Sequence, residues 1–240
     1  MGYKRQEILE KCTEALSMDE PFYQNKMINY RGKTTDTDEY YTEIICEFIC
    51  RHLNELTRRI HKITRRKSYR TETHTGEFSP NSNRKEEIIA MKLFKQSRDK
   101  GTFFPYIGKI IDYQTPLKSE SGDDAGKIDL LSYDGKTLHI LELKKPDSKE
   151  TMLRCMLEGY TYLHTVDQKK LICDFGLPGN TLLQANPLVF YGGIQYDENQ
   201  ENRIWLTKFA QKTNSIPVYL TEQNGIYSVK EGEPHEEANR

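Results

Sequence analysis

The sequence predicts a mixed α/β fold with an N-terminal helical segment. Two stretches with helical periodicity, at about 83–98 and 147–163, bracket three strand-like stretches at 103–112, 127–133 and 137–144. Further strand-like stretches follow at 188–196 and 216–220, with a helical segment near 200–212 between them and a hairpin turn expected at Asn224-Gly225. Because helices and strands interleave, these elements fit a central mixed sheet flanked by helices.

Composition and charge exclude several classes of protein. The chain has 240 residues, of which 36% are hydrophobic and 30% charged, so it suits one globular domain with or without an appendage. It lacks a run of about 18 to 20 apolar residues and begins with a charged stretch, which predicts a cytoplasmic protein without membrane contact. A net charge of -1 excludes binding of nucleic acid through overall basicity, so any such site needs local clustering.

Five cysteines, an odd number without a CxxC pair, favour reduced thiols over a disulfide framework or a zinc site.

The first 70 residues predict a helical segment with a basic end. A helix at 4–18 precedes a polar stretch, and a long helix at 38–67 follows, in which apolar residues recur at spacings of three and four. Over residues 51–70, eight basic residues against Glu55 give a net charge of +7. Such a run can hold phosphates, although a solvated helix face is the alternative. The expected nucleic-acid contacts are Arg58, Arg59, Lys62, Arg65, Arg66 and Lys67.

The same long helix leaves the oligomeric state open, because its apolar stripe at 45–63 could bury against a second copy in a homodimer. A connector is expected at 71–82, where Gly, Pro, Ser and Asn occur without periodicity. The α/β domain then covers 83–230, and an acidic tail covers 231–240.

Acidic and basic residues gather in the predicted hairpin formed by 127–133 and 137–144. An Asp-Gly dipeptide between two apolar runs predicts a two-residue turn that pairs Tyr133 with Lys136. In that register Asp129, Glu142 and Lys144 share one face, and the two acids are diagonal neighbours. Diagonal side chains lie roughly 7 to 8 Å apart, so both carboxylates can reach one cation. A cross-strand salt bridge at a sheet end is the structural alternative.

This segment resembles the PD-(D/E)XK nuclease superfamily. Asp129 in GKIDLL is followed, after 12 residues, by Glu142-Leu143-Lys144 in LHILELKK, within the order helix, three strands, helix. The resemblance covers about residues 83–196 and implies a restriction endonuclease-like core. It also implies that Asp129, Glu142 and the main-chain carbonyl of Leu143 bind Mg²⁺, with Mn²⁺ as a substitute. Lys144 would orient or activate the attacking water.

Further residues of the flanking helices extend the resemblance. An acid of the preceding helix often completes such a site, and Glu86 falls within the buried stripe of the helix at 83–98, whereas Glu87 falls at its edge. Several branches of the superfamily carry Gln-x-x-x-Tyr in the following helix, where this chain has Glu158 and Tyr162. Glu158 is expected either to contact Lys144 or to form half of a salt bridge with Arg154.

The resemblance therefore implies a Mg²⁺-dependent hydrolase that cuts phosphodiester bonds of nucleic acid, with DNA favoured over RNA. A metal ion and a lysine suit this chemistry, because they polarise the phosphoryl oxygen, activate water and stabilise developing negative charge. Two alternatives remain: a catalytically inactive nuclease-fold module that binds nucleic acid or a protein partner, and a small protein-interaction domain built on the long helix.

Overall fold

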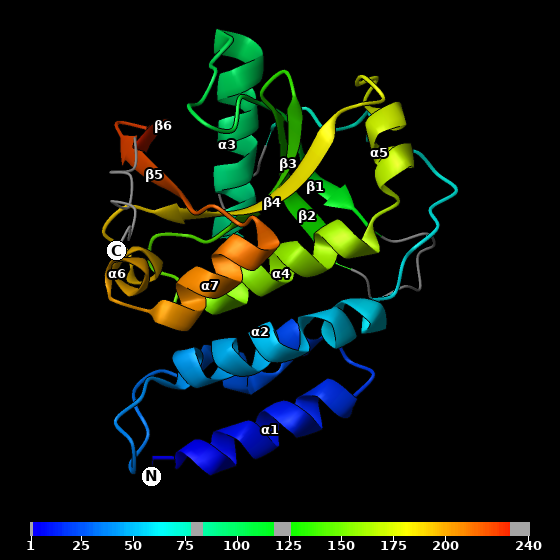
Figure 1. Ribbon diagram of the computed structural model, residues 1–240. Coiled ribbons are helices and arrows are strands. Elements are labelled where there is room, and N and C mark those ends of the chain that lie inside the picture. The colour runs from blue at the N-terminus through cyan, green and yellow to red at the C-terminus, as the bar shows by residue number, and fades with distance from the viewer. Residues whose placement is uncertain (1, 78–83, 118–125, 231–240) are drawn as a thin grey trace.

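The computed structural model describes residues 2–77, 84–117 and 126–230, and within them it contains one six-stranded sheet and seven α-helices (Figure 1). The predicted mixed α/β class is confirmed. The helices are α1 (Arg5–Ser17), α2 (Tyr41–Arg59), α3 (Lys85–Lys100), α4 (Met152–Thr165), α5 (Gln168–Asp174), α6 (Ile194–Gln200) and α7 (Ile204–Thr213). The strands are β1 (Lys109–Pro116), β2 (Lys127–Tyr133), β3 (Thr137–Leu143), β4 (Leu182–Phe190), β5 (Val218–Gln223) and β6 (Ile226–Lys230). Two short 3-10 helices, Phe22–Gln24 and Lys26–Asn29, lie between α1 and α2.

The strands follow one another across the sheet in chain order from β1 to β6. Strands β1, β2 and β3 form an antiparallel meander, β4 and β5 run parallel to β3, and β6 returns antiparallel to β5. A crossover through α4 and α5 joins β3 to β4, as a parallel pair requires. The carboxyl end of β3 therefore leads into the loop before α4, and this loop borders the candidate site.

Helices cover both faces of the sheet (Figure 1). Because side chains alternate along a strand, Leu138 and Ile140 of β3 join the hydrophobic cluster on the α4 side, whereas Leu141 and Leu143 join the cluster on the α3 side. Glu142 and Lys144 continue the series of Leu138 and Ile140, so the alternation directs them to the α4 side.

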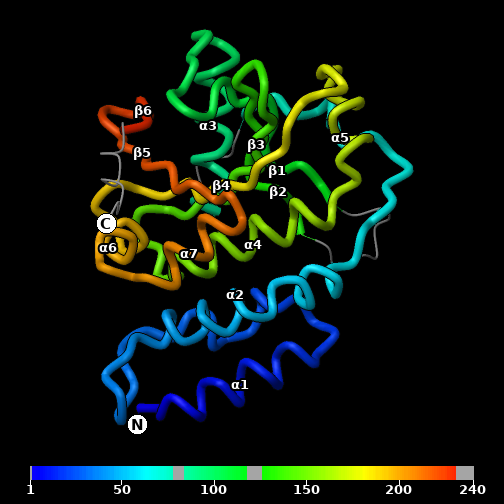
Figure 2. The backbone as a smooth tube through the Cα atoms, in the orientation of Figure 1, coloured from blue at the N-terminus to red at the C-terminus, as the bar shows by residue number. Residues whose placement is uncertain are grey.

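The N-terminal helices form a further layer against α4 and α7 (Figures 1 and 2). Ile45 and Ile49 of α2 are fully buried in the same hydrophobic cluster as Met152 and Met156 of α4. Most of the apolar stripe at 45–63 is thus covered by the chain's own helices, which weakens the case for a homodimer, while Leu53, Ile60 and Ile63 stay partly exposed. The acidic tail at 231–240 and residues 78–82 of the expected connector lie outside the described residues.

The long helix is shorter than predicted, because α2 ends at Arg59 and not at residue 67. Beyond it, the main-chain N–H of Ile63 donates to the carbonyl of Thr165 at 2.9 Å. The N–H of Tyr69, a fully buried residue, donates to Asp174 at 2.8 Å. These tertiary hydrogen bonds replace helical ones, so the basic segment at 60–70 runs as irregular chain beside α4 and α5.

The first strand begins later than predicted. Residues 103–108 form a turn closed by a bridge between Phe104 and Gly108, so the strand expected at 103–112 is instead β1 at Lys109–Pro116. Tyr106 in this turn has a φ of 68°, in the left-handed region. The run of apolar residues therefore placed the start of the strand six residues too early.

The later strands also begin and end at residues other than those predicted. The strand expected at 188–196 is β4 at Leu182–Phe190, because the chain turns at Gly192 and starts α6. The strand expected at 216–220 is β5, and the predicted turn at Asn224-Gly225 is confirmed by positive φ at both residues and by the pair Gln223–Ile226.

Helix α4 begins at Met152 after the N-cap Thr151, whose side chain accepts the N–H of Arg154. The sequence favours an earlier start, with Asp147 or Ser148 as the N-cap.

The β2–β3 hairpin differs from its predicted register by two residues. Tyr133 pairs with Leu138 and not with Lys136. The carboxylate of Asp134 accepts the N–H groups of Lys136 and Thr137 at 2.8 and 2.7 Å, which moves the turn one residue along the chain. The side chain of Asp134 is thus the physical reason for the different register.

A shift of two residues keeps each side chain on its predicted face, because strand side chains alternate with a period of two. Asp129, Glu142 and Lys144 therefore still share one face. Extending the observed pair Leu130–Leu141 by one residue places Asp129 directly opposite Glu142, where the prediction had them diagonal. Direct neighbours lie closer than diagonal ones, so the observed register brings the two acids nearer to each other.

Gly108→Ala is expected to lower the free energy of unfolding by more than about 4 kcal/mol, an exceptional value for one substitution. Gly108 has a φ of 75°, and a Cβ there would lie 2.1 Å from the main-chain oxygen of Tyr133. Gly101→Ala is the matched control, because Gly101 has a φ of 67° and a Cβ there would meet no heavy atom within 4 Å beyond its chain neighbours and its own helix. It should cost only ~1–2 kcal/mol, the strain of the left-handed conformation. Equal losses in urea denaturation would contradict the close approach at Gly108.

Candidate active site

The candidate site lies where β3 ends and β2 begins. Glu142 is the penultimate residue of β3, Lys144 follows the strand, and Asp129 lies near the start of β2. Glu142 is 3% exposed and Lys144 is 5% exposed. The structure therefore brings the three residues of the predicted motif together on the face of the sheet that α4 covers, with Glu142 and Lys144 buried and Asp129 partly exposed.

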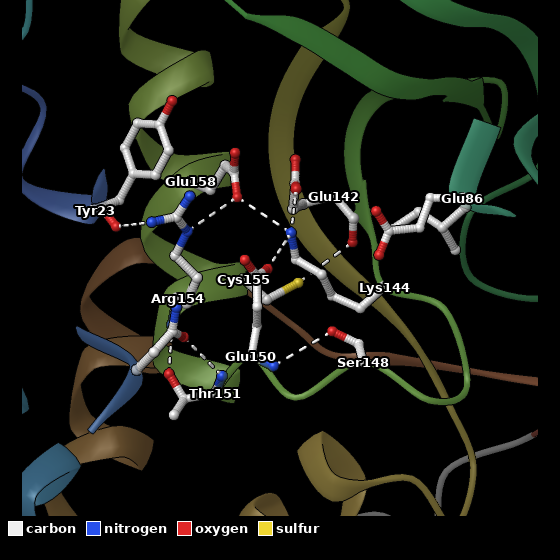
Figure 3. Close-up of polar contacts among 12 residues, drawn as sticks. Tyr23, Glu86, Glu142, Lys144, Ser148, Glu150, Thr151, Arg154, Cys155 and Glu158 are labelled. Atoms are coloured by element: carbon white, nitrogen blue, oxygen red, sulfur yellow. Dashed lines mark hydrogen bonds and ion pairs between the residues drawn. The ribbon is translucent and has the colours of Figure 1, made fainter. Parts of the chain in front are cut away.

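The ammonium of Lys144 lies among three carboxylates (Figure 3). Its Nζ is 2.7 Å from Glu142 Oε1, 2.7 Å from Glu150 Oε2 and 3.2 Å from Glu158 Oε2. Burial opposes the charge of the ammonium, but the carboxylates of Glu142 and Glu158 outweigh it and raise the pKa of Lys144 well above its usual value. Lys144 is therefore a fixed positive charge at the centre of the site.

These contacts pair only one of the two carboxylate oxygens of Glu142. Its Oε1 pairs with Lys144, whereas its buried Oε2 accepts no hydrogen bond from an N–H or O–H of the described residues, and the Glu158 carboxylate lies within hydrogen-bond reach of the Glu142 carboxyl group. Burial raises the pKa of Glu142 well above its usual value, and the neighbouring carboxylates of Asp129 and Glu158 add to this effect. A buried carboxylate oxygen without a partner is costly, so the position suits a proton or a further cation.

Asp129 is anchored by hydrogen bonds to two elements. Its Oδ2 accepts the main-chain N–H of Leu143, and its Oδ1 accepts Nε2 of Gln114, both at 3.0 Å. Burial raises the pKa of Asp129 to about 7, although Lys144 and the Leu143 N–H oppose this shift. Asp129 therefore changes its protonation state near neutral pH.

Helix α4 supplies a polar stripe that faces Lys144. Glu158 accepts from Nε of Arg154 at 3.3 Å and from the hydroxyl of Tyr162 at 3.0 Å, in addition to its ion pair with Lys144. The two roles considered for Glu158 thus hold together. Burial opposes the negative charge of Glu158, but Lys144 and Arg154 outweigh it, so the pKa of Glu158 is lowered. This carboxylate orients the ammonium of Lys144.

The two candidate acids of α3, Glu86 and Glu87, make different contacts. Glu86 Oε1 accepts the main-chain N–H of Lys145 at 3.2 Å, and Figure 3 shows the Glu86 carboxylate pointing toward Glu142. Glu87 instead pairs with the exposed Arg84 at 3.2 Å and does not line the site. Glu86 is therefore the acid that α3 contributes, as its position in the buried stripe indicated.

These residues open into a cavity of about 660 Å³. Six carboxylates and five basic side chains line it, together with Ser148 and Tyr162. The acids are Glu86, Asp129, Glu142, Asp147, Glu150 and Glu158, and the bases are Lys127, Lys144, Lys145, Lys149 and Arg154. Its volume is that of a small-molecule or nucleotide-sized site, and its lining is far more polar than that of a typical ligand pocket.

Sequence reasoning missed Glu150, which forms one of the shortest ion pairs of Lys144. Glu150 lies in the loop between β3 and α4, where no periodicity orders side chains. The N-terminal segment holds this loop: Arg31 donates to the carbonyls of Lys149 and Glu150, and the side chain of Asn29 accepts the N–H of Thr151 at 3.1 Å. Only the tertiary structure reveals these contacts.

The predicted nucleic-acid contacts lie apart from this cavity. Arg58 and Arg59 end α2, and the other four residues lie in the irregular segment that follows. Of the six, Arg58, Arg59, Lys62, Arg66 and Lys67 are exposed, and Arg65 is partly buried against Tyr69. None of them lines the cavity of about 660 Å³.

Comparison with known proteins returned no matching family model, no matching curated protein and no matching solved structure. Within residues 2–77, 84–117 and 126–230, no three His, Cys, Asp or Glu side chains form a ready-made metal cluster. No helix in the described part of the chain has the length and apolar character needed to cross a bilayer.

The raised pKa of Asp129 predicts a pH-dependent stability in metal-free buffer. An acid whose folded pKa is raised opposes folding above its unfolded pKa near 3.8, and the cost grows until the pH passes about 7. Asp129→Asn removes this cost. In EDTA, its stability relative to the wild type should rise by up to about 4 kcal/mol between pH 4 and pH 8, measured by urea denaturation.

Asp147→Asn is the matched control for this measurement. Asp147 also lines the cavity, but it is exposed and its pKa is lowered by the ion pair with Lys85. Its substitution should not reproduce the gain at high pH. A difference between Asp129→Asn and the wild type that stays flat with pH would contradict the raised pKa of Asp129.

Proposed function

We propose that the protein is a metal-dependent nuclease that hydrolyses phosphodiester bonds of nucleic acid, with DNA favoured over RNA. The observation that carries the proposal is the unpartnered Oε2 of buried Glu142, beside Asp129 and in the same cavity as Lys144. A buried carboxylate oxygen without a donor calls for a proton or a cation, and a divalent cation shared with Asp129 accounts for both acids together. The likeness to the PD-(D/E)XK nucleases in sequence motif and element order supports the same function and a restriction endonuclease-like core.

The donor set fits a hard divalent cation. Asp129, Glu142 and Glu86 offer carboxylate oxygens, and the main-chain carbonyl of Leu143 adds the further oxygen that the resemblance implies; oxygen donors of this kind suit Mg²⁺ and Mn²⁺. When bound, such a cation polarises the phosphoryl oxygen and lowers the pKa of a bound water. Its positive charge would also compensate Oε2 of Glu142, which accepts no hydrogen bond within the described residues.

The protein's own residues divide the remaining tasks. Lys144 can donate hydrogen bonds from its ammonium to a water or to a phosphate oxygen where negative charge develops. Glu158 and Glu150 hold this ammonium in place, and Arg154 and Tyr162 in turn hold Glu158. Such a chain of contacts fixes the direction of Lys144 before a substrate arrives.

The ion pairs of Lys144 also favour a second candidate. Because three carboxylates already neutralise the ammonium, the same site would suit an inactive nuclease-fold module that binds nucleic acid or a protein without cutting it. The two candidates differ in one measurable property, the metal-dependent cleavage of a substrate.

The nuclease function predicts cleavage of single- or double-stranded DNA or RNA in Mg²⁺ or Mn²⁺ and none in EDTA. Glu142→Gln and Lys144→Ala should each lower the rate by about a hundredfold or more, because each removes a charge acting on the reacting phosphate. Glu86→Gln should lower it by about 10- to 100-fold, whereas its neighbour Glu87→Gln should not change it. Absence of cleavage by pure wild type with every metal and substrate would leave the inactive module.

Metal binding has a second readout that does not depend on activity. Mg²⁺ at 100 times its Kd should stabilise the wild type by about 2.7 kcal/mol and raise its Tm. Glu142→Gln should abolish most of this rise, and Glu87→Gln should keep it. An equal rise in all three proteins would show that Mg²⁺ binds elsewhere.

A further inference from the structure

A second cavity of about 710 Å³ lies between the N-terminal helices and α4. The end of α1 and the following turn form one wall, which includes Met18 and Phe22. The end of α2 forms the facing wall with Leu56, Arg58 and Arg59. We call this space the second cavity, and it has the size of a typical ligand pocket.

The second cavity adjoins the candidate active site across one side chain, Tyr162, which lines both cavities. The hydroxyl of Tyr162 donates to Glu158, the carboxylate that pairs with Lys144. Tyr23 packs edge-on against Tyr162, with ring centroids 5.9 Å apart, and also lines the second cavity. Tyr162 is therefore a shared wall between the two cavities, and both tyrosines are buried.

Gly126 packs closely against Tyr162. A Cβ at position 126 would lie 2.5 Å from the hydroxyl oxygen of Tyr162, so any other residue there must displace Tyr162. The glycine does not have the positive φ that would require glycine for backbone reasons. The absence of a side chain at Gly126 therefore leaves room for Tyr162, which separates the two cavities.

The walls of the second cavity combine two chemistries. Met18 is exposed and Ile60 and Ile63 are partly exposed, so these three side chains offer apolar surface against which an unstacked base can pack. Arg58 and Arg59 are exposed at its edge, and the basic segment continues beyond them along residues 60–70. Asp19 and Glu20 line the opposite wall, so negative charge would favour the arginine side.

We propose, resting on the nuclease function above, that the second cavity binds an unpaired nucleotide of a single-stranded nucleic acid whose scissile phosphate lies in the active site. Arg58 and Arg59 bind the phosphates on one side of this nucleotide. A duplex cannot present a base to such a cavity without unpairing, because its bases are stacked in the interior. The substrate class is therefore a single strand or an unpaired end.

The test measures binding without catalysis. Full-length Glu142→Gln protein in EDTA is titrated with a fluorescein-labelled 20-nucleotide DNA and with its duplex, using fluorescence anisotropy at several salt concentrations. The single strand should bind more tightly. Adding Arg58→Gln and Arg59→Gln should weaken its binding by about 25-fold at 0.1 M salt and lower the slope of log K against log salt by about 1.4, the effect of two lost phosphate contacts.

Lys109→Gln with Lys136→Gln is the matched control, because both lysines are exposed and lie at the far end of the β2–β3 hairpin from the active site. This pair should leave affinity and slope nearly unchanged. Asp19→Asn with Glu20→Gln should instead strengthen binding of the single strand, because it removes negative charge from the opposite wall.

Met18→Trp tests the cavity itself. Met18 is 40% exposed and lines the cavity, so a tryptophan can fill the space without disturbing the core. It should weaken binding of the single strand by tenfold or more and leave duplex binding unchanged. Tighter binding of the duplex, or unchanged single-strand binding in the Met18 and arginine variants, would overturn the proposal and leave an apolar peptide as the occupant to test. Binding as expected with no cleavage by wild type would overturn the nuclease function alone.

Discussion

The buried ammonium of Lys144 is the interaction on which the rest of the site depends. It joins β3 through Glu142, the loop before α4 through Glu150, and α4 through Glu158. Removing such charges from water costs several kcal/mol per ion, and hydrophobic residues of similar volume often stabilise a protein more. A cluster with one carboxylate oxygen left without a partner therefore needs a reason other than stability. Function supplies one, since perturbed titratable groups concentrate at functional sites.

The N-terminal segment belongs to the architecture of the site. Arg31 and Asn29 hold the loop that carries Glu150, and the hydroxyl of Thr151 donates to the carbonyl of Ile28 at 2.7 Å. The start of α4 is therefore fixed by residues more than a hundred positions earlier in the chain. Because α4 in turn carries Glu158, the direction of the Lys144 ammonium depends on packing between the two parts of the chain.

The face of each motif residue could be predicted, because alternation along a strand survives a register error of two. The register itself could not, since it depends on hydrogen bonds from the carboxylate of Asp134 to its own turn. Helical periodicity indicated Glu86, and the resemblance indicated Glu158. Periodicity overran the end of α2, because the main-chain N–H of buried Tyr69 is held by Asp174. Gln114 and Glu150 carry no periodic signal: Gln114 has a φ of 49°, and Glu150 lies in a loop.

In the candidate active site, the protonation of the acidic side chains and the binding of a cation or phosphate depend on each other. Six carboxylates and five basic side chains give a net charge of -1 when all are ionised, which repels a phosphate. A divalent cation would change this to +1 and attract one. Because Asp129 titrates near pH 7 and the pKa of Glu142 is raised, cation binding must displace protons from these acids. Cation affinity should therefore rise with pH, and the attraction of the cavity for phosphate should rise with it.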